Sequence, residues 1–369
     1  MTDLSLDELL MSGDLDGLAH EESYPETIPG RTVHIDADFV AYHISYEKPD
    51  DPKTIDDMQH NAEVIIEHMR RAAAAEHVHM HLTPSTSDKG GRYSFAIQKP
   101  YQGNRDDKAK PRLLHIMRQW LSDRYPGTLH EFCEADDGMS SAQYLAIEQG
   151  NTALSIIASK DKDLRMVPGW HMVWDTGELV FVDPAQPFGW VELVERTSAS
   201  GQVTKQLKGY GHKWFWAQML IGDQADNVQG LPKITGKYMN SIQPTAPVIE
   251  ARKILANEQA TDKQKQKAIK ALNDRKAGLC GPATAILLLD LVHDNPSALL
   301  LIKSLYESYG NEIGFIHHQT GEPVRWDRVF LSEARMLWMR RERTNPDCVL
   351  NFLQEIALEA QQPNHLRAA

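Results

Sequence analysis

The stretch LSIIASKDKDLRMV, residues 154–167, contains an apolar run that ends abruptly in two aspartates, Asp161 and Asp163. Carboxylates one residue apart on an extended chain point to the same side and repel each other. A buried strand that ends in this way needs a positive charge beside it. The rest of the sequence indicates where that charge comes from.

Three other short stretches carry acidic clusters. They are Asp36 with Asp38 in HIDADF, Glu134 with Asp136 and Asp137 in CEADDG, and Asp223 with Asp226 in GDQADN. One cluster of this kind is common on a protein surface. Four clusters, three of them at the expected ends of strands or starts of helices, indicate that the carboxylates meet in one site.

Strands and helices are predicted to alternate in the first half of the chain. Apolar runs predict a strand that ends at Asp36 and further strands over 77–83 and 152–159. Helices are expected over 61–76 and 136–150. This alternation is typical of an α/β fold with a mainly parallel sheet flanked by helices, whose sites lie at the carboxyl ends of the strands.

The nine clustered carboxylates need compensating charge. Gathered without cations, they would repel by many kcal/mol at an effective dielectric constant of about 20. Sites made only of oxygen ligands favour Mg²⁺ or Mn²⁺, and a site this rich in carboxylates can hold two ions about 4 Å apart. Divalent metal is therefore the predicted partner of Asp161 and Asp163.

The net charge of −12 is unevenly distributed. Residues 1–30 contain eight acidic side chains and no lysine or arginine, and we expect them to form an acidic flexible tail. Without those eight residues the net charge is about −4, and without the nine clustered carboxylates as well it is about +5. The acidic total is therefore compatible with a nucleic-acid partner.

Several other classes of protein and site are disfavoured. No run of eighteen apolar residues occurs, so no membrane span is predicted. The three cysteines are widely spaced without a CxxC pair, which fits a reducing cytosol and argues against a cysteine zinc site. His77, His79 and His81 share one face of a predicted strand. No fourth ligand accompanies them, so we expect histidines on a helix-covered or partly exposed face.

Taken together, the motifs resemble the 5′→3′ exonuclease and flap endonuclease family, particularly its phage and bacterial members. The acidic motifs are HIDADFVAY, CEADDGMSS, ASKDKDL and GDQADNVQGL. KPYQGNRDDKAKP resembles the family segment that leads into the arch around single-stranded DNA, and AGLCGPATAILLL resembles its helix–hairpin–helix. The resemblance, over about residues 31–290, implies a PIN-like nuclease core with a helical helix–hairpin–helix lobe.

The resemblance also implies a chemistry, namely metal-dependent hydrolysis of phosphodiester bonds from 5′ ends. By position, the resemblance implies two sets of catalytic and metal-binding residues. The first ion would be held by Asp36, Glu134, Asp136 and Asp137, and the two-ion site would be completed by Asp161, Asp163, Asp223 and Asp226. Asp38 is a further metal ligand, at a position where relatives have either Asp or Asn. In a two-ion site, one ion activates water and the other stabilises the leaving 3′ oxygen. The implied partner is DNA with a 5′ end (duplex, flap or gap), bound by a monomer in phage replication or recombination.

A further set of residues is expected to contact DNA. The set is Tyr42, Arg92, Lys99, Gln102, Arg105, Gly278, Gly281 and Thr284. Arg92 and Arg105 suit bidentate contacts with phosphates, and Tyr42 either stacks on a terminal base or packs at the start of a helix. Backbone amides of the hairpin would bind duplex phosphates without reading sequence, with K⁺ as a candidate ion there.

The place of the hairpin is open between two stretches. GLPKITGK, residues 230–237, directly follows Asp226 as the family expects, whereas 277–284 carries the better match to the hairpin motif. Some forty residues separate the two, which suggests an insertion. That insertion contains six lysines and arginines within 263–276, either a solvated helix face or a DNA-binding patch.

Two departures from the family pattern keep other functions open. The family has a lysine where this chain has Gln102, and only Lys99 or Lys108 is nearby to replace it. The second strand is followed by Thr83 rather than an aspartate, with Asp88 a few residues on. One alternative is therefore a DNA-end-binding protein with weak or no cleavage. The other is an RNase H-like enzyme that removes RNA primers from RNA–DNA hybrids.

The chain divides into four predicted segments. They are an acidic flexible tail (1–30), a nuclease domain (31–220), a helix–hairpin–helix region with a lysine-rich insertion (221–310) and a helical C-terminal extension (311–369). Beyond residue 200 we expect helices. Trp214, Phe215 and Trp216 should lie in a helix core, and the arginines at 335–343 on a solvated helix face.

Overall fold

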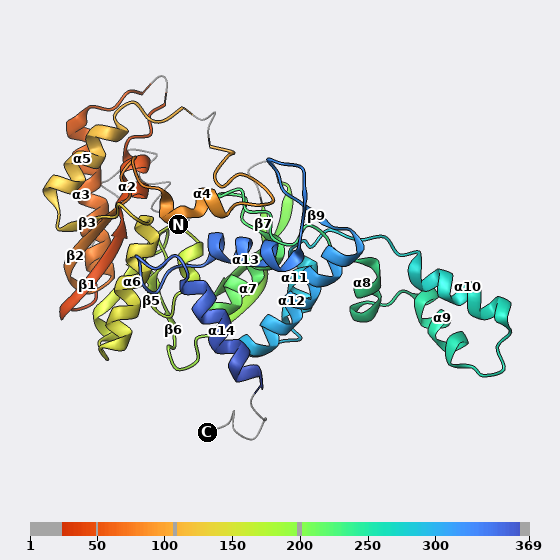
Figure 1. Ribbon diagram of the computed structural model, residues 1–369. Coiled ribbons are helices and arrows are strands. Elements are labelled where there is room, and N and C mark those ends of the chain that lie inside the picture. The colour runs from red at the N-terminus through yellow and green to blue at the C-terminus, as the bar shows by residue number, and fades with distance from the viewer. Residues whose placement is uncertain (1–23, 49–50, 106–108, 198–200, 362–369) are drawn as a thin grey trace.

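The computed structural model describes residues 24–48, 51–105, 109–197 and 201–361 (Figure 1). Most of the predicted acidic tail and Lys108 lie outside the described residues. Within those ranges, no helix has both the length and the apolar character needed to span a bilayer.

The predicted mainly parallel sheet is confirmed. Its strands are β1 (Ile28–Asp36), β2 (Ala75–Leu82), β3 (Gly127–Leu129), β4 (Ser155–Ala158), β5 (Gly169–Met172) and β6 (Leu179–Val182). They lie in the order β3-β2-β1-β4-β5-β6, and only β6 is antiparallel to its neighbour. The chain leaves β1 for β2 and β3 on one side and returns to β4 on the other. The strand order therefore reverses between β1 and β4.

Helices cover both faces of this sheet. One face carries α2 (Ala37–Ile44), α3 (Ile55–Ala72) and α5 (Leu114–Arg124), and the other carries α6 (Ala135–Glu148). The side chains of β1 alternate, because Val33 and Ile35 pack against the three helices while His34 lies on the opposite face. The helix expected over 61–76 begins earlier, at a capping box in which Thr54 and Asp57 bond to each other's backbone.

The histidines of β2 lie on the sheet face that α6 covers, as expected. His81 is buried, and its ring nitrogens lie 3.0 Å from His34 Nδ1 and 2.9 Å from His130 Nε2. His79 Nε2 lies 2.9 Å from Thr128 Oγ1. Burial lowers the pKa of His34 to about 3 and that of His130 to about 4, so these rings stay neutral. His77 is exposed at the start of the row.

The expectation of helices alone beyond residue 200 is wrong, because an antiparallel ribbon precedes them. Strands β7 (Trp190–Thr197) and β8 (Val203–Tyr210) pair along their whole length. The remaining elements are α4 (Arg92–Phe95), α7 (His212–Ile221), α8 (Gly236–Ile242), α9 (Ala246–Ala256), α10 (Asp262–Asn273), α11 (Pro282–Leu289), α12 (Asn295–Glu312), β9 (Phe315–Ile316), β10 (Pro323–Val324), α13 (Trp326–Leu337) and α14 (Cys348–Gln361).

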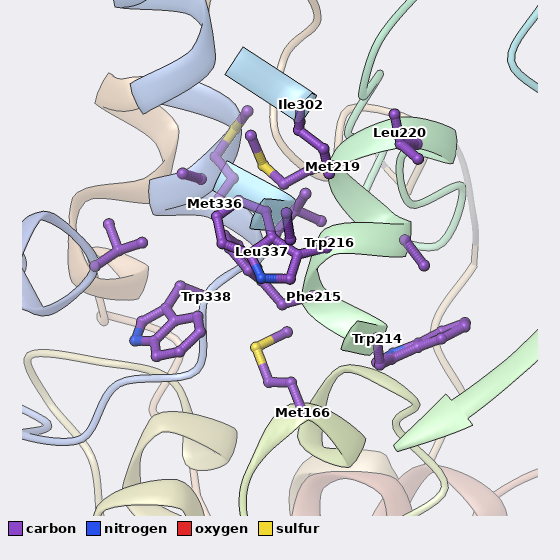
Figure 2. Packing of buried hydrophobic residues seen from close by; sticks show 14 of the residues in the cluster. Met166, Trp214, Phe215, Trp216, Met219, Leu220, Ile302, Met336, Leu337 and Trp338 are labelled. Carbon is purple, nitrogen blue, oxygen red and sulfur yellow. The ribbon is translucent and has the colours of Figure 1, made fainter. Parts of the chain in front are cut away.

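A second apolar core joins the helical half to the sheet. Trp214, Phe215 and Trp216 on α7 are buried in it, which confirms that prediction (Figure 2). Trp338, which follows α13, packs edge-on against Phe215 at 4.9 Å between ring centres. The solvated face expected for the C-terminal arginines is wrong for Arg340, because that residue is buried beyond the end of α13.

Candidate metal centre

The acidic clusters gather at the carboxyl edge of the sheet, where the strand order reverses. Asp36 is the last residue of β1, and Asp161 and Asp163 follow β4. Glu134 immediately precedes α6, and Asp223 and Asp226 lie in the turn after α7. Open α/β sheets place ligands at such a reversal, beyond the carboxyl ends of the strands.

One group of carboxylates comprises Asp36, Asp136 and Asp161. Burial and the nearby charges of Asp38 and Asp161 raise the pKa of Asp36 to about 7, although Phe39 N–H donates a 3.0 Å bond to its carboxylate. Burial and the charge of Asp226 raise the pKa of Asp161 to about 6. The pKa of Asp136 is also raised strongly, by burial and then by the charges of Asp161 and Asp36. Its Oδ1 is buried without a hydrogen-bond partner among the described residues.

A second group comprises Asp163, Asp223 and Asp226, each of which offers an oxygen within 4.8 Å of the others. Burial and the charges of Asp161 and Asp223 raise the pKa of Asp163 well above its usual range. Gln218 Nε2 on α7 donates to Asp163 Oδ1. The turn is closed by two backbone bonds between Asp223 and Val228, of 2.9 and 2.7 Å. The sequence prediction that these three aspartates converge is thereby confirmed.

Tyr101 and Gln102 link Glu134 to Asp226. The Tyr101 hydroxyl lies 2.8 Å from Glu134 Oε2 and 2.8 Å from Asp226 Oδ2, yet it has a single proton to donate. Gln102 Nε2 lies 3.3 Å from Glu134 Oε1 and 3.0 Å from Asp226 Oδ1. The hydroxyl can therefore donate to only one of the two carboxylates. The other carboxylate has an unfavourable contact with the hydroxyl oxygen unless that carboxylate is itself protonated or binds a cation.

Gln102 thus lies inside the acidic site rather than on a DNA-facing surface. It is buried and has a left-handed backbone conformation with φ of +53°, and its N–H bonds to Asp226 O at 2.8 Å. A lysine at this position would place its ammonium among the same carboxylates.

Several basic side chains form ion pairs with carboxylates of the site, a role that was not predicted for any of them, and one is Arg92, whose Nη1 lies 3.1 Å from Glu134 Oε2. Lys89 Nζ lies 3.1 Å from Glu134, Arg105 Nη2 2.5 Å from Asp226 and Lys162 Nζ 2.5 Å from Asp223. Arg105 was expected to contact DNA, and its side chain remains 47% exposed. The sequence does contain a signal for Lys162. It lies between Asp161 and Asp163 in SKDKD, and a long lysine side chain next to two aspartates of the site can reach the same site.

Asp137 and Arg92 have a task that differs from the one predicted. Arg92 is fully buried and binds Asp137 through two bonds of 2.6 and 2.9 Å, and it also donates to Met336 O and Trp338 O. Burial works against the charge of Asp137, but Arg92 and then Arg340 bring its pKa below the usual value. The prediction that Arg92 holds a substrate phosphate is wrong in this conformation. Both oxygens of Asp137 face guanidinium groups rather than the other carboxylates.

Asp38 and the segment after β2 are also tied to the protein. Asp38 accepts a 2.9 Å bond from Thr83 N–H and pairs with Arg118 at 2.9 Å. Thr83 in turn accepts a 2.8 Å bond from Ala135 N–H at the start of α6. Asp88 is exposed and accepts a bond from Gly90 N–H, so it does not replace the missing aspartate of the second strand.

The remaining residues expected to contact DNA lie on the surface. Tyr42 on α2 is 45% exposed, and Lys99 is exposed beside the segment that carries Gln102. Nothing packs Tyr42 into the core, so the stacking role stays a prediction. Lys99 does not reach the acidic oxygens within ion-pair distance in the described residues.

The two candidate hairpin stretches lie side by side, although some forty residues of sequence separate them. Ile234 and Gly278 exchange backbone bonds of 2.8 and 3.0 Å. Because Gly278 N–H is used in this bridge, it is not free to bind a phosphate as predicted. Gly281 caps the start of α11, and Thr284 N–H bonds to Gly281 O at 3.0 Å within that first turn.

The donor set fits hard divalent cations. It consists of carboxylate oxygens alone, arranged in two adjacent groups, and Asp136 Oδ1 has no other partner. Mg²⁺ and Mn²⁺ prefer such ligands, and a bound ion would favour the ionised forms that burial disfavours. Asp36, Asp136 and Asp161 would hold one ion and Asp163, Asp223 and Asp226 a second, with Glu134 between them.

Comparison with known proteins gives limited help. No protein-family model matches the chain, and no curated protein matches it. Solved structures with some likeness include a T5 protein co-crystallised with metal ions, at 14% identity over 90% of this chain and all of that one, with a TM-score of 0.35. A second is T5 5′-exonuclease with bound zinc, at 15% identity over 83% of this chain and all of that one, with a TM-score of 0.35. A third is a bacteriophage T5 flap endonuclease with DNA and metal ions, at 14% identity over 90% of this chain and all of that one, with a TM-score of 0.34. At such TM-scores the likeness carries no argument by itself.

Proposed function

We propose that this chain is a metal-dependent 5′→3′ exonuclease of the flap endonuclease type, which hydrolyses phosphodiester bonds of DNA. The observation that carries the proposal is the pair of buried carboxylate groups at the reversal of the strand order. Several of these carboxylates have raised pKa values, and three lie within 4.8 Å of one another. Such a concentration of buried acids is unfavourable unless cations complete it.

The residues of the chain take distinct parts in this scheme. Two Mg²⁺ or Mn²⁺ ions, when bound, would activate a water molecule and stabilise the leaving 3′ oxygen. Tyr101 and Gln102 orient Glu134 and Asp226 through the bonds described above. The ammonium of Lys162 pairs with Asp223 and the guanidinium of Arg105 pairs with Asp226, and both groups can contact a substrate phosphate above the site.

Binding of DNA is assigned to the surfaces around the site. The two hairpins joined at Ile234 and Gly278 would hold the duplex backbone, with K⁺ as a candidate ion there. Tyr42, exposed on α2, would stack on the base at the 5′ end. We expect the protein to act as a monomer in phage replication or recombination.

A DNA-end-binding protein with little cleavage is a second candidate. The observation that favours it is that the acidic oxygens already have partners within the chain, through Lys89, Arg105 and Lys162, while Gln102 supplies no charge. If these ion pairs persist, they keep divalent ions out and leave a site that only binds.

Cleavage assays separate these candidates. We expect Mg²⁺-dependent release of nucleotides from 5′-labelled duplex, flap and gapped DNA, and no release with a chelator. Preferential cleavage of the RNA strand in an RNA–DNA hybrid would instead favour RNase H-like removal of primers. Tight binding of 5′ ends without release, with either Mg²⁺ or Mn²⁺, would identify the end-binding protein and contradict the nuclease assignment.

A further inference from the structure

The insertion between the two hairpins forms a self-contained helical arm, defined here as residues 244–274. It consists of α9 and α10 packed side by side, and it projects away from the rest of the molecule (Figure 1). Its ends meet at the base, where Arg275 Nη1 donates a 2.6 Å bond to Gln243 O and Asn240 Nδ2 donates a 2.8 Å bond to Leu272 O. The arm therefore leaves and re-enters the fold at one place.

Few apolar side chains of this arm are buried. Val248, Ala251 and Ala268 are its only buried residues in the described structure, and all three are small or medium-sized. Ile249 and Ile269 are 45% and 49% exposed. An element with so small a core contributes little to folding, so its surface is the feature to explain.

That surface carries concentrated positive charge. Residues 233–276 contain ten lysines and arginines against four aspartates and glutamates, a net charge of +6 in a chain of net charge −12. Lys263, Lys267 and Lys270 are exposed and spaced by four and three residues, so they form one stripe along α10. Lys265 falls on the opposite, half-buried side.

The stripe has no counter-charge within the protein. Among the described residues, none of the three stripe lysines forms an ion pair, and the arm's own pair joins Lys253 to Glu250 at 3.9 Å. Like charges at these spacings slightly destabilise a helix. A stripe that is both unfavourable for the helix and unpaired is well suited to an anionic partner.

The geometry points to the phosphate backbone of a nucleic-acid duplex as that partner, and we propose that the arm extends the duplex contact beyond the hairpins. This inference rests on the proposed function. The arm starts at the hairpins, where Lys233 and Lys237 continue the positive charge. α10 has 12 residues. At a rise of 1.5 Å per residue it is about 18 Å long, comparable to about five base pairs of B-form DNA. Contacts of this kind read no sequence.

The test compares a short and a long duplex. In the full chain, Lys263, Lys267 and Lys270 are changed together to alanine, which preserves the helix because alanine has the highest helix propensity. Binding is measured with Ca²⁺ in place of Mg²⁺ on duplexes of about 10 and about 30 base pairs, across a salt series. The triple arginine variant, which keeps the charge, is the matched control.

We expect the alanine variant to lose affinity on the long duplex, with a salt slope shallower by up to about 2.7 for three lost phosphate contacts. The short duplex and the arginine variant should behave as wild type. A second variant, in which a short glycine–serine turn replaces residues 244–274, should reproduce the same pattern. An unchanged slope on the long duplex, or equal losses on both lengths, would overturn the proposal and leave the exposed isoleucines as a protein-binding surface. Failure of the nuclease assignment is seen separately, as an absence of Mg²⁺-dependent cleavage by the wild-type chain.

Discussion

Lys162 Nζ lies 2.5 Å from Asp223 Oδ1, inside the acidic group that also contains Asp163 and Asp226. The lysine and a divalent ion would compete for the same oxygen. Basic side chains of the protein thus neutralise part of the negative charge of the site, for which only metal ions were predicted. This competition can be measured.

Changing Lys162 to methionine should tighten metal binding, because the competing ammonium is removed while the length of the side chain is kept. The Lys162 side chain is 36% exposed, and partly exposed ion pairs contribute up to about 1 kcal/mol, equivalent to about a fivefold gain in Ca²⁺ affinity by titration calorimetry. Lys160→Met is the control, since Lys160 pairs instead with Asp175 at 3.0 Å. Equal Ca²⁺ affinities in all three proteins would show that Lys162 does not compete.

Changing Gln102 to lysine should preserve or raise the cleavage rate. The new ammonium would lie between Glu134 and Asp226, and a positioned cation can contribute several kcal/mol to phosphoryl transfer. Both side chains are unbranched at Cβ, so the positive φ of this residue should be tolerated equally. The measurement is single-turnover cleavage of a 5′-labelled duplex. A large loss of rate in a folded variant would show that the family lysine is misplaced here.

Stabilisation by Mg²⁺ should grow with pH. The pKa values of about 7 for Asp36 and about 6 for Asp161 exceed the value of about 3.9 expected in an unfolded chain. The folded apoprotein therefore binds more protons than the unfolded chain between about pH 4 and 7, and these groups lower its stability as pH rises through that window. Because metal binds the ionised carboxylates, the Mg²⁺-induced rise in Tm should be small near pH 5 and large above pH 7.

The pH experiment needs paired melting curves with and without Mg²⁺. His34 and His212, whose pKa burial lowers to about 3, stabilise the fold increasingly as pH rises towards their unfolded value of about 6.5. Their effect has the opposite sign, but it is present in both curves and cancels in the difference. An Mg²⁺ shift that does not depend on pH would contradict the raised pKa values at the site.

Asp137 and Asp136 should respond oppositely to replacement by asparagine. Asp137→Asn leaves the buried Arg92 without its bidentate partner, and breaking a buried pair typically costs about 3–5 kcal/mol. Asp136→Asn removes a carboxylate that no described residue pairs, so the apoprotein should be as stable as wild type or more so. Urea denaturation of both apo variants checks this. Similar stabilities would mean that the Arg92–Asp137 pair is not a structural clamp.

The sequence predicted the elements that local pattern determines. The strands around Val33 and Ile156 and the helix α6 are where they were expected, because strands buried in an α/β sheet appear in the sequence as short apolar runs. That Asp36 and Asp161 lie close together followed from the rule that parallel strands end at one edge of a sheet, whereas Asp223 and Asp226 lie in the turn after α7, to which this rule does not apply.

Contacts between residues that are far apart in the sequence could not be predicted from local sequence patterns. Nothing near Arg92 in the sequence indicates that it binds Asp137 and the backbone at Met336, 244 residues away. Arg92 was therefore predicted to contact DNA at the surface, whereas it is buried. Strand β8 was missed for a related reason, since most of its residues are exposed and it lacks the apolar alternation of a core strand.

Asp161 provides the most direct test of the metal centre. Asp161 Oδ1 accepts a 2.8 Å bond from Asp163 N–H, so Asp161→Asn keeps this acceptor while removing the charge. Cleavage should be abolished, because one fewer anionic ligand lowers the occupancy or shifts the position of the metal. The fold should survive, since no cavity is created and a repelling charge is lost. The apo variant should melt at or above the wild-type temperature, and the stabilisation by Mg²⁺ should shrink.

The same variant separates catalysis from binding. DNA affinity measured with Ca²⁺, which occupies oxygen sites without supporting the chemistry, should fall far less than the cleavage rate. Asp175→Asn, an acid outside the two carboxylate groups that pairs with Lys160, is the matched control and should cleave as wild type. Melting curves with and without Mg²⁺ and cleavage assays are run on the same preparations. Full cleavage by Asp161→Asn would refute the metal-site assignment, and with it the main support for a nuclease.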